Sequence, residues 1–164
     1  GIAPGLMISM AEIEVDLETG KYEILDYVGV ADCGTIIHPQ GLSQQINGGG
    51  VWGFGMAATE RHVYDPQIAL PANLGMYQAK LPTILDVPAE MPNGAVDIAD
   101  PYNPVGGRGV GEPSQGSAVA AITSAIADAL DGHLFNRVPV TPDMIVNHAT
   151  GAEQESKLLA LNTF

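Results

Sequence analysis

Apolar and polar residues alternate along the first part of the chain. Residues 7–17 place apolar side chains at every second position near their end, with acidic side chains between them. A period of two predicts a half-buried β-strand. Residues 18–20 end in a glycine suited to the left-handed position of a tight hairpin turn, so residues 21–31 are expected to return as a second strand. The apolar set of the first strand is Ile13, Val15 and Leu17.

Two later stretches carry the spacing of helices. Residues 39–60 predict a helix even though they include five glycines between positions 48 and 55. A mid-helix glycine costs roughly 0.5–1 kcal/mol relative to alanine, so another body must approach this backbone closely enough to offset the loss. That body is either a neighbouring helix or sheet, or a ligand. An alanine-rich helix follows at residues 114–130, and its core stripe is Val119, Ile122, Ile126 and Leu130.

Shorter elements occupy the rest of the chain. Residues 61–64 and 95–98 predict short strands, with a long proline-containing stretch to residue 92 between them. Thr141 and Pro142 are suited to be the N-cap and the first residue of a last short helix. A strand hairpin combined with these helices predicts an α+β fold.

One loop places a single carboxylate at the start of a helix. Residues 106–111 are rich in glycine, Glu112 follows them, and Pro113 favours the first helical position. Such a loop can hold the Glu112 side chain rigidly against a ligand. A simpler interpretation makes Glu112 an acidic residue of a first helical turn, favoured there by the helix dipole. Neither the dinucleotide-binding fingerprint nor the P-loop motif is matched.

The composition indicates a chain that buries much of its surface against a partner. The 20 glycines and 12 prolines make up about a fifth of the 164 residues, against an average of about 12%. A hydrophobic content of 46% is nevertheless enough for a core. The net charge of −13 excludes a basic stripe for nucleic acid and argues against binding to an anionic membrane. No apolar run reaches the ~18 residues of a membrane-spanning helix.

The titratable residues offer no second catalytic centre and no zinc site. The single cysteine, Cys33, follows a strand and is interpreted as a small buried residue. The four histidines lack the spacing of zinc ligands, and His38 is expected to mark the entry of the glycine-rich helix. No nucleophile elbow or Cys–His pair is present. A basic secretory leader is absent, so we expect a cytoplasmic location, with the periplasm as the alternative if a partner chain carries the signal.

Several of these segments, in the same order, resemble the molybdenum hydroxylase family of xanthine oxidase and aldehyde oxidoreductase. The family's Gly-(Val/Ile)-Gly-Glu motif is matched by residues 109–112. A tyrosine followed by Leu-Pro-Thr, in residues 77–83, lies where the family carries a similar stretch. The resemblance continues to residues 138–142 and spans the chain from near residue 7 to about His148. The family's earlier Gln-x-x-Gly and Gly-x-Gly segment is matched by Gln45, Gly48, Gly53 and Gly55.

The resemblance implies a molybdenum–pterin cofactor, which in bacteria is usually extended by cytosine dinucleotide. Glu112 matches the family's general base, which takes a proton from the molybdenum-bound hydroxide before the oxyanion attacks an electrophilic carbon. Gln45 matches the glutamine that hydrogen-bonds around the ligands of the metal. No residue of this chain is expected to ligate the metal itself. The glycines expected to let the backbone approach the cofactor are Gly48, Gly49, Gly109 and Gly111.

Two positions raise questions of their own. Asn47 stands where the family often has glutamate, which puts a charge-based role there in doubt. Arg108 stands where xanthine-oxidising members often have lysine. Its guanidinium could contact a phosphate, a carbonyl or a surface acid, and we favour the surface acid because most arginines are solvated.

The family also implies a domain organisation and a set of partners. Residues 1–150 correspond to the C-terminal portion of the molybdopterin-binding domain, and residues 151–164 are expected to form a peripheral tail. The implied partners are the larger remainder of the molybdenum-binding subunit, subunits that carry [2Fe–2S] clusters and FAD, and a small-molecule substrate. The expected reaction oxidises a C–H carbon of an N-heterocycle or an aldehyde, with water as the oxygen source.

Two alternatives stay open. The chain could be a non-catalytic structural or assembly subunit, in which Glu112 only caps a helix. It could also belong to a family member that oxidises carbon monoxide or reductively removes the hydroxyl of an aryl thioester. Metal content and turnover after substitution of Glu112 would separate assembly from catalysis.

Overall fold

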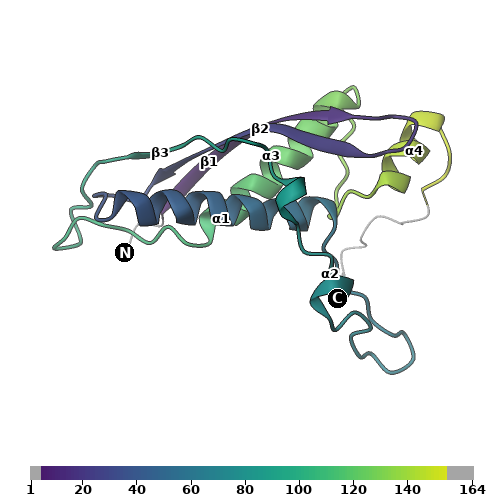
Figure 1. Cartoon of the computed structure of the whole chain (residues 1–164), viewed down its shortest axis with the longest axis horizontal. Coiled ribbons are helices and arrows are strands. Elements are labelled where there is room, and N and C mark those ends of the chain that lie inside the picture. The colour runs from purple at the N-terminus through teal and green to yellow at the C-terminus, as the bar shows by residue number, and fades with distance from the viewer. Residues whose placement is uncertain (1–4, 155–164) are drawn as a thin grey trace, which may run out of the picture.

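The computed structural model describes residues 5–154 and begins with the predicted strand hairpin (Figure 1). Strands β1 (Leu6–Val15) and β2 (Tyr22–Asp32) pair antiparallel. The Asp16 carboxylate holds the turn between them by accepting hydrogen bonds from two backbone N–H groups. Gly20 closes the turn with φ of 71°, which confirms the predicted left-handed position.

A third strand and two helices complete the main layers. β3 (Asn93–Val96) lies parallel to β2, so the strand order is β1-β2-β3, and it begins two residues before the strand predicted at residues 95–98. Helices α1 (Pro39–Ala58) and α3 (Pro113–Ala129) pack on one face of this sheet (Figure 1). Both lie where helices were predicted, and the mixed helix-and-strand class is confirmed.

The sheet is joined to α3 by polar as well as apolar contacts. The Ser9 hydroxyl lies 2.8 Å from the Tyr27 hydroxyl and 2.8 Å from the Ser117 hydroxyl of α3. The inner face of β1 ends at Val15. Leu17, predicted to share that face, lies beyond the strand and is 48% exposed, because the chain has already entered the turn.

Most glycines of α1 allow close packing. A Cβ on Gly53 would lie 2.5 Å from the Ala118 Cβ of α3, and one on Gly50 would lie 2.9 Å from the Tyr27 ring. Gly49 faces the Ser114 side chain at the start of α3. Gly48 differs, because nothing in the described chain lies within 4 Å of the position of its Cβ. Packing therefore accounts for most of the unusual glycine content of this helix.

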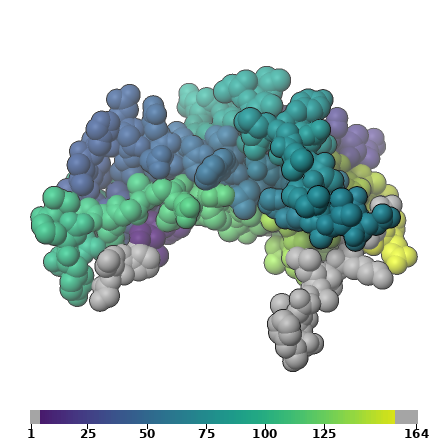
Figure 2. Space-filling model, turned by 90° about the horizontal axis from the view of Figure 1, so that it is seen from below, coloured from purple at the N-terminus to yellow at the C-terminus, as the bar shows by residue number. Residues whose placement is uncertain are grey.

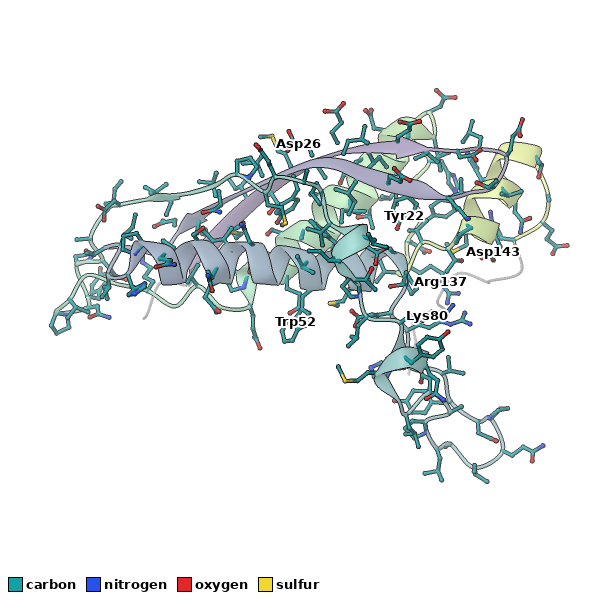
Figure 3. The ribbon with its side chains drawn as sticks, viewed as in Figure 1. Tyr22, Asp26, Trp52, Lys80, Arg137 and Asp143 are labelled. Atoms are coloured by element: carbon teal, nitrogen blue, oxygen red, sulfur yellow. The ribbon has the colours of Figure 1, made fainter. Side chains whose placement is uncertain are left out.

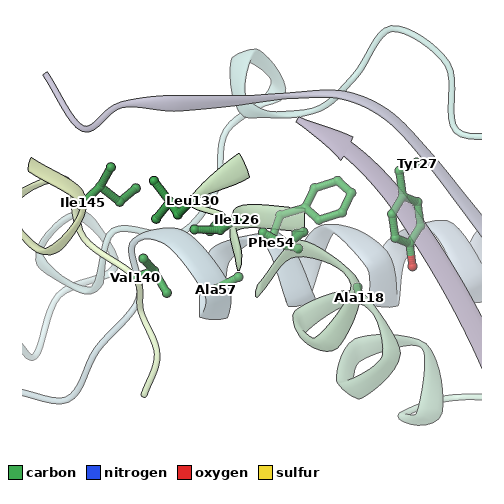
Figure 4. Close-up of a cluster of buried hydrophobic side chains, with 9 residues drawn as sticks. Tyr27, Phe54, Ala57, Ala118, Ile126, Leu130, Val140 and Ile145 are labelled. Atoms are coloured by element: carbon green, nitrogen blue, oxygen red, sulfur yellow. The ribbon is translucent and has the colours of Figure 1, made fainter. Parts of the chain in front are cut away.

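The apolar core lies between the two helices and the sheet (Figure 4). The Tyr27 and Phe54 rings meet edge to face, with centroids 5.0 Å apart. The predicted stripe on α3 is buried at three of its four positions, while Val119 is only half-buried. The buried cluster consists of Tyr27, Phe54, Ala57, Ala118, Ile122, Ile126, Leu130, Val140 and Ile145.

The last helix, α4 (Pro142–Thr150), closes one end of this core. Thr141 is its extended N-cap residue and Pro142 its first residue, as the sequence predicted, although the Thr141 side chain makes no capping hydrogen bond. Gly151 ends the helix in the left-handed conformation, with φ of 72°. Residues 155–164, most of the predicted peripheral tail, lie outside the described residues.

The prediction of a strand at residues 61–64 is wrong. This segment forms only an isolated bridge between Tyr64 and Pro71, because no neighbouring strand is available to pair with it. It begins an arm, residues 61–81, which leaves the end of α1, contains the short helix α2 (Met76–Ala79) and stands away from the body in Figure 1. Figure 2 views the molecule from the side of this arm. A short 3₁₀ helix, η1 (Ile84–Asp86), follows it.

None of the helices described between residues 5 and 154 has the length and apolar character needed to cross a membrane.

Candidate active site

The structure brings Gln45 of α1 beside the loop that leads to Glu112. The hydroxyl of Ser114 lies 3.0 Å from the carbonyl oxygen of Gly111 and 3.3 Å from that of Gln45, so its hydrogen is shared between the two segments. A Cβ on Gly111 would lie 3.6 Å from the Gln45 side-chain nitrogen. Ser114 is fully buried, and sequence analysis missed it because nothing in its local pattern distinguishes it from other small helix residues.

Glu112 lies at the boundary between the loop and α3. Its backbone is already helical, with φ of −78° and ψ of −26°, and Pro113 is the first residue of the helix. The Glu112 side chain makes no capping hydrogen bond and is exposed. A helix cap made by a Glu112 side-chain hydrogen bond is therefore absent, whereas the simpler interpretation, an acid favoured by the helix dipole, agrees with its place. The carboxylate stands at the positive end of the helix dipole, where negative charge is favoured.

The predicted cofactor-binding glycines fall into two groups. Positions for a Cβ on Gly48 and Gly109 have nothing of the described chain within 4 Å, so their backbone can be approached from outside. Gly49 and Gly111 instead face Ser114 and Gln45. These two glycines allow α1 and the loop to approach each other, whereas the first two leave open surface beside the same junction.

A hollow of about 700 Å³ lies next to this junction. Gln45 and Gly109 both line it, together with Cys33 at the end of β2 and residues of the loop before α3. Glu112 is not among its lining residues and lies farther along the loop. Two of the predicted site residues, Gln45 and Gly109, therefore line the hollow, while Glu112 lies outside it at the start of α3.

Arg108 anchors the loop through a pair of acids. Its guanidinium donates to Asp100 at 2.7 Å and to Asp32 at 3.0 Å, and only 17% of its side chain is exposed. The preference for an acidic partner is thus confirmed, but Arg108 is largely buried and not solvated. The Tyr102 backbone N–H and the Arg108 guanidinium lower the pKa of Asp100, and the Asp100 carboxylate in turn raises the pKa of Arg108.

The remaining polar residues singled out in the sequence have structural contacts. Asn47 donates to the Met91 carbonyl at 3.1 Å and accepts from the Asn93 side chain at 3.0 Å, so it ties α1 to the segment at β3. His38 accepts from the Gly41 N–H at 2.7 Å and caps α1, which confirms its predicted place. Cys33 is buried, and burial raises the pKa of its thiol.

No group of three or more potential metal-ligating side chains occurs within residues 5–154. The candidate site instead offers a carboxamide, open backbone at two glycines and a free carboxylate. A pterin carries amide and amine groups that a carboxamide and backbone groups can hydrogen-bond, and it needs close backbone approach. The donor set and the open glycine surface therefore fit the polar groups of an organic cofactor such as a pterin.

Comparisons with known proteins agree with this chemistry. The sequence profile of the molybdopterin cofactor-binding domain matches residues 5–88. The gamma subunit of the 6-hydroxypseudooxynicotine dehydrogenase complex of Paenarthrobacter nicotinovorans is 32% identical over 92% of this chain and 19% of its own length. The molybdenum-binding subunit of Escherichia coli xanthine dehydrogenase is 30% identical over 85% of this chain and 18% of its own.

A solved structure shows the same arrangement. Quinoline 2-oxidoreductase of Pseudomonas putida 86 superposes with a TM-score of 0.76 at 29% identity, over 86% of this chain and 18% of that one. The chain thus spans about a fifth of the length of the relatives that it matches. It belongs to the molybdopterin cofactor-binding domain family and corresponds to a segment of the molybdopterin-binding subunit of the molybdenum hydroxylases.

Proposed function

We propose that this chain forms part of the catalytic site of a molybdenum-dependent hydroxylase, with Glu112 as the general base. Residues 1–150 would be the C-terminal portion of a larger molybdopterin-binding domain, and residues 151–164 a peripheral tail. The observation that carries the proposal is the exposed, uncapped carboxylate of Glu112 at the α3 start, beside the junction of Gln45 and the glycine loop.

The bound molybdenum–pterin group would supply the acceptor for the electrons removed from the substrate carbon. Glu112 would accept a proton at its carboxylate as the oxygen that derives from water attacks a C–H carbon. A positioned carboxylate suits this role because it lies outside the hydrogen bonds of the helix and is free to face the reacting oxygen.

The other site residues would hold the cofactor. The Gln45 carboxamide would donate a hydrogen bond without adding charge, and the open backbone at Gly48 and Gly109 would lie against the pterin. Gly49 and Gly111 would act by letting α1 and the loop come together. The cofactor would be the cytosine dinucleotide form that the family resemblance implies.

The names of the relatives support the proposed substrate class, and the family resemblance supplies the proposed partners. Their names include dehydrogenases or oxidoreductases of xanthine, quinoline, a nicotine derivative and aldehydes. A small N-heterocycle or an aldehyde is therefore the proposed substrate class. The proposed partners are the remainder of the molybdenum-binding subunit and chains that carry [2Fe–2S] clusters and FAD.

The decisive test is Glu112→Gln in the complete enzyme. We expect molybdenum and pterin content to stay at the wild-type level, while turnover falls about 10²–10⁴-fold, the usual contribution of a general base. Glu18→Gln, which changes another exposed carboxylate, in the β1–β2 turn, is the matched control and should leave turnover unchanged. Turnover within tenfold of wild type at full metal occupancy would reject Glu112 as the base.

A structural or assembly role is the second candidate. It predicts that Glu112→Gln lowers the yield of the assembled complex and its metal content together. The exposed carboxylate without a capping contact argues against this outcome, because its loss removes no hydrogen bond within residues 5–154.

A further inference from the structure

The Ser114 side chain occupies a space that exists because residue 49 is glycine. A Cβ on Gly49 would overlap the Ser114 hydroxyl and lie 2.8 Å from the Ser114 Cβ, so any side chain there would displace it. Ser114 is 0% exposed, which keeps water from taking the place of its hydroxyl. Trp52 of the same helix, by contrast, is 58% exposed and points away from the sheet (Figure 3). The closely packed side of α1 is therefore the side that meets Ser114.

The Ser114 hydroxyl contacts the backbone beside both groups proposed to act in the site. Its two acceptors are the carbonyl oxygens of Gly111, at 3.0 Å, and of Gln45, at 3.3 Å. The Gly111 carbonyl belongs to the same planar peptide unit as the Glu112 nitrogen, so a hydrogen bond to it restricts the orientation of Glu112. The Gln45 carbonyl lies on the residue whose carboxamide is proposed to bind the cofactor. One hydroxyl thus links the peptide before Glu112 to the backbone of Gln45.

A row of hydroxyl groups joins Ser114 to the sheet. The Ser117 hydroxyl donates to the Ser114 carbonyl at 3.0 Å and lies 2.8 Å from the Ser9 hydroxyl of β1. The Ser9 hydroxyl also lies 2.8 Å from that of Tyr27. Because each hydroxyl carries one hydrogen, donation by Ser117 makes Ser9 its donor and Tyr27 the donor to Ser9. The bonds all run in one direction, from the sheet to the first turn of α3, and each strengthens the next.

The loop before Glu112 is fixed at its other end by Arg108. The Arg108 guanidinium is held by two carboxylates of neighbouring segments, and its backbone N–H donates to the Cys33 carbonyl at 2.6 Å. Residues 109–111 lie between this anchor and Glu112, and two of these three residues are glycines, which have the freest backbone. The contact with Ser114 therefore fixes the downstream end of this segment.

We propose that Ser114 is a positioning residue, which places the Glu112 carboxylate relative to the Gln45 carboxamide and acts on turnover through Glu112. This inference rests on the proposed function, because the proposed function supplies the role of Glu112. If the hydroxyl is lost, the peptide between Gly111 and Glu112 can turn, and the carboxylate leaves the geometry needed for proton transfer. A misplacement of about 1 Å at a catalytic group can lower the rate about 10²-fold.

The first test removes this hydroxyl in the complete enzyme. We expect Ser114→Ala to lower kcat about 10–100-fold, with KM within about twofold and with molybdenum and pterin content at the wild-type level. Thr123→Val is the matched control, because it also removes a hydroxyl that donates to a carbonyl of α3, at 2.9 Å, and it should leave kcat unchanged. A kcat of Ser114→Ala within about twofold of wild type at full cofactor content would overturn the proposal.

Combination with Glu112→Gln distinguishes positioning from general stabilisation. A residue that acts through Glu112 loses its effect once that carboxylate is gone, so Ser114→Ala should then lower the remaining turnover by less than about twofold. A further loss as large as in the wild-type background would show that Ser114 acts independently of Glu112, which contradicts the proposal.

Hydrogen exchange gives a readout that does not depend on turnover. The Gln115 amide donates to the Glu112 carbonyl at 3.0 Å and so reports on the end of the loop. We expect Ser114→Ala to speed the exchange of this amide about fivefold, as the loss of one hydrogen bond implies. The Leu130 amide, at the end of α3, should exchange as in the wild type. An unchanged Gln115 amide would show that the hydroxyl does not hold the loop, and the proposal would be wrong.

A pair of compensating substitutions separates the hydroxyl from its packing. Gly49→Ala alone should displace the Ser114 side chain and lower both the melting temperature and kcat. Adding Ser114→Gly makes room for the new methyl group, so the melting temperature should recover while kcat should stay low. Recovery of kcat in the double variant would assign the effect to packing and overturn the positioning role.

The two proposals fail in different measurements. Turnover retained by Glu112→Gln would reject the general base. Loss of turnover in Glu112→Gln together with a normal kcat in Ser114→Ala would keep the base and reject only the positioning role.

Discussion

The α1–α3 body and the arm are both rich in apolar residues, but the body buries its apolar side chains and the arm exposes them. In the body, glycines let two helices touch, and side chains such as Ile122 and Phe54 are at most 1% exposed. In the arm, hydrogen bonds fix the backbone while Leu74 and Tyr77 face outward. An apolar pattern thus does not by itself show that a side chain is buried within the chain.

The largest effect should separate side chains buried within the chain from side chains exposed on the arm. Ile122→Ala removes a fully buried side chain, so we expect the free energy of opening of α3 to fall by about 2–5 kcal/mol. Ile68→Ala makes the same change in the arm at a side chain that is 62% exposed, and it should leave the α3 opening energy unchanged. Hydrogen exchange of α3 amides in the complete enzyme measures both. Equal effects would mean that body and arm form one cooperative unit.

A second pair of variants compares two glycines of α1 that have different surroundings. Gly53→Val would force a side chain against Ala118 of α3, and we expect a loss of about 1–3 kcal/mol or more in stability. Gly48→Val enters open space and should change stability by less than about 0.5 kcal/mol. If the pterin lies against Gly48, the same variant should lose pterin and molybdenum.

Thermal unfolding and cofactor content of the purified enzyme give both results. Full cofactor loading in Gly48→Val would remove this glycine from the proposed cofactor surface. A stable, assembled Gly53→Val would show that α1 and α3 can separate at little cost, contrary to the packing described above.

Sequence periodicity predicted the elements whose partners lie within the chain. The hairpin, the helices after Pro39 and Pro113, and the cap at His38 all form where expected, because their signals are local. The strand at residues 61–64 does not form, since a strand needs a neighbour to pair with and the arm stands apart. For the candidate site, the motif placed Gln45 and the loop in order along the chain, but only the fold shows that they meet.

The separate tasks of neighbouring glycines could not be predicted. Gly48 and Gly49 are equivalent in the motif, and their difference depends on which side of α1 faces α3. The role of Ser114 was hidden for the same reason, because one of its two carbonyl partners, that of Gln45, lies 69 residues away in the sequence. Such tertiary contacts leave no periodic signal.

The loop that carries the site should respond to acid through Asp100. The Tyr102 N–H and the Arg108 guanidinium lower the pKa of the Asp100 carboxyl in the folded state. The contribution of Asp100 to stability is therefore present above the unfolded pKa of about 3.9. It is lost as pH falls through the folded pKa. We expect the protection of the Tyr102 amide to be constant from about pH 5 to 8 and to fall below about pH 4. Asp100→Asn should reduce the protection at neutral pH and abolish the acid-dependent step. An unchanged acid step would place the titrating group elsewhere.

The smallest effect should appear where α4 meets the end of α3. The His133 ring stacks on the His148 ring with centroids 3.8 Å apart. The His133 and Phe135 rings meet edge to face, with centroids 4.6 Å apart. Burial, and then the charge of His148, lower the pKa of His133, so the neutral imidazole is favoured in the folded state. The contribution of the neutral His133 ring to stability is therefore complete above the unfolded pKa of about 6.5 and is lost as pH falls through the lower folded pKa.

We expect the α4 amides to exchange slightly faster at pH 5 than at pH 8, after correction for the intrinsic rate. His133→Phe keeps an aromatic ring for stacking but cannot be protonated, so it should weaken that pH dependence, and an unaltered dependence would assign it to another group.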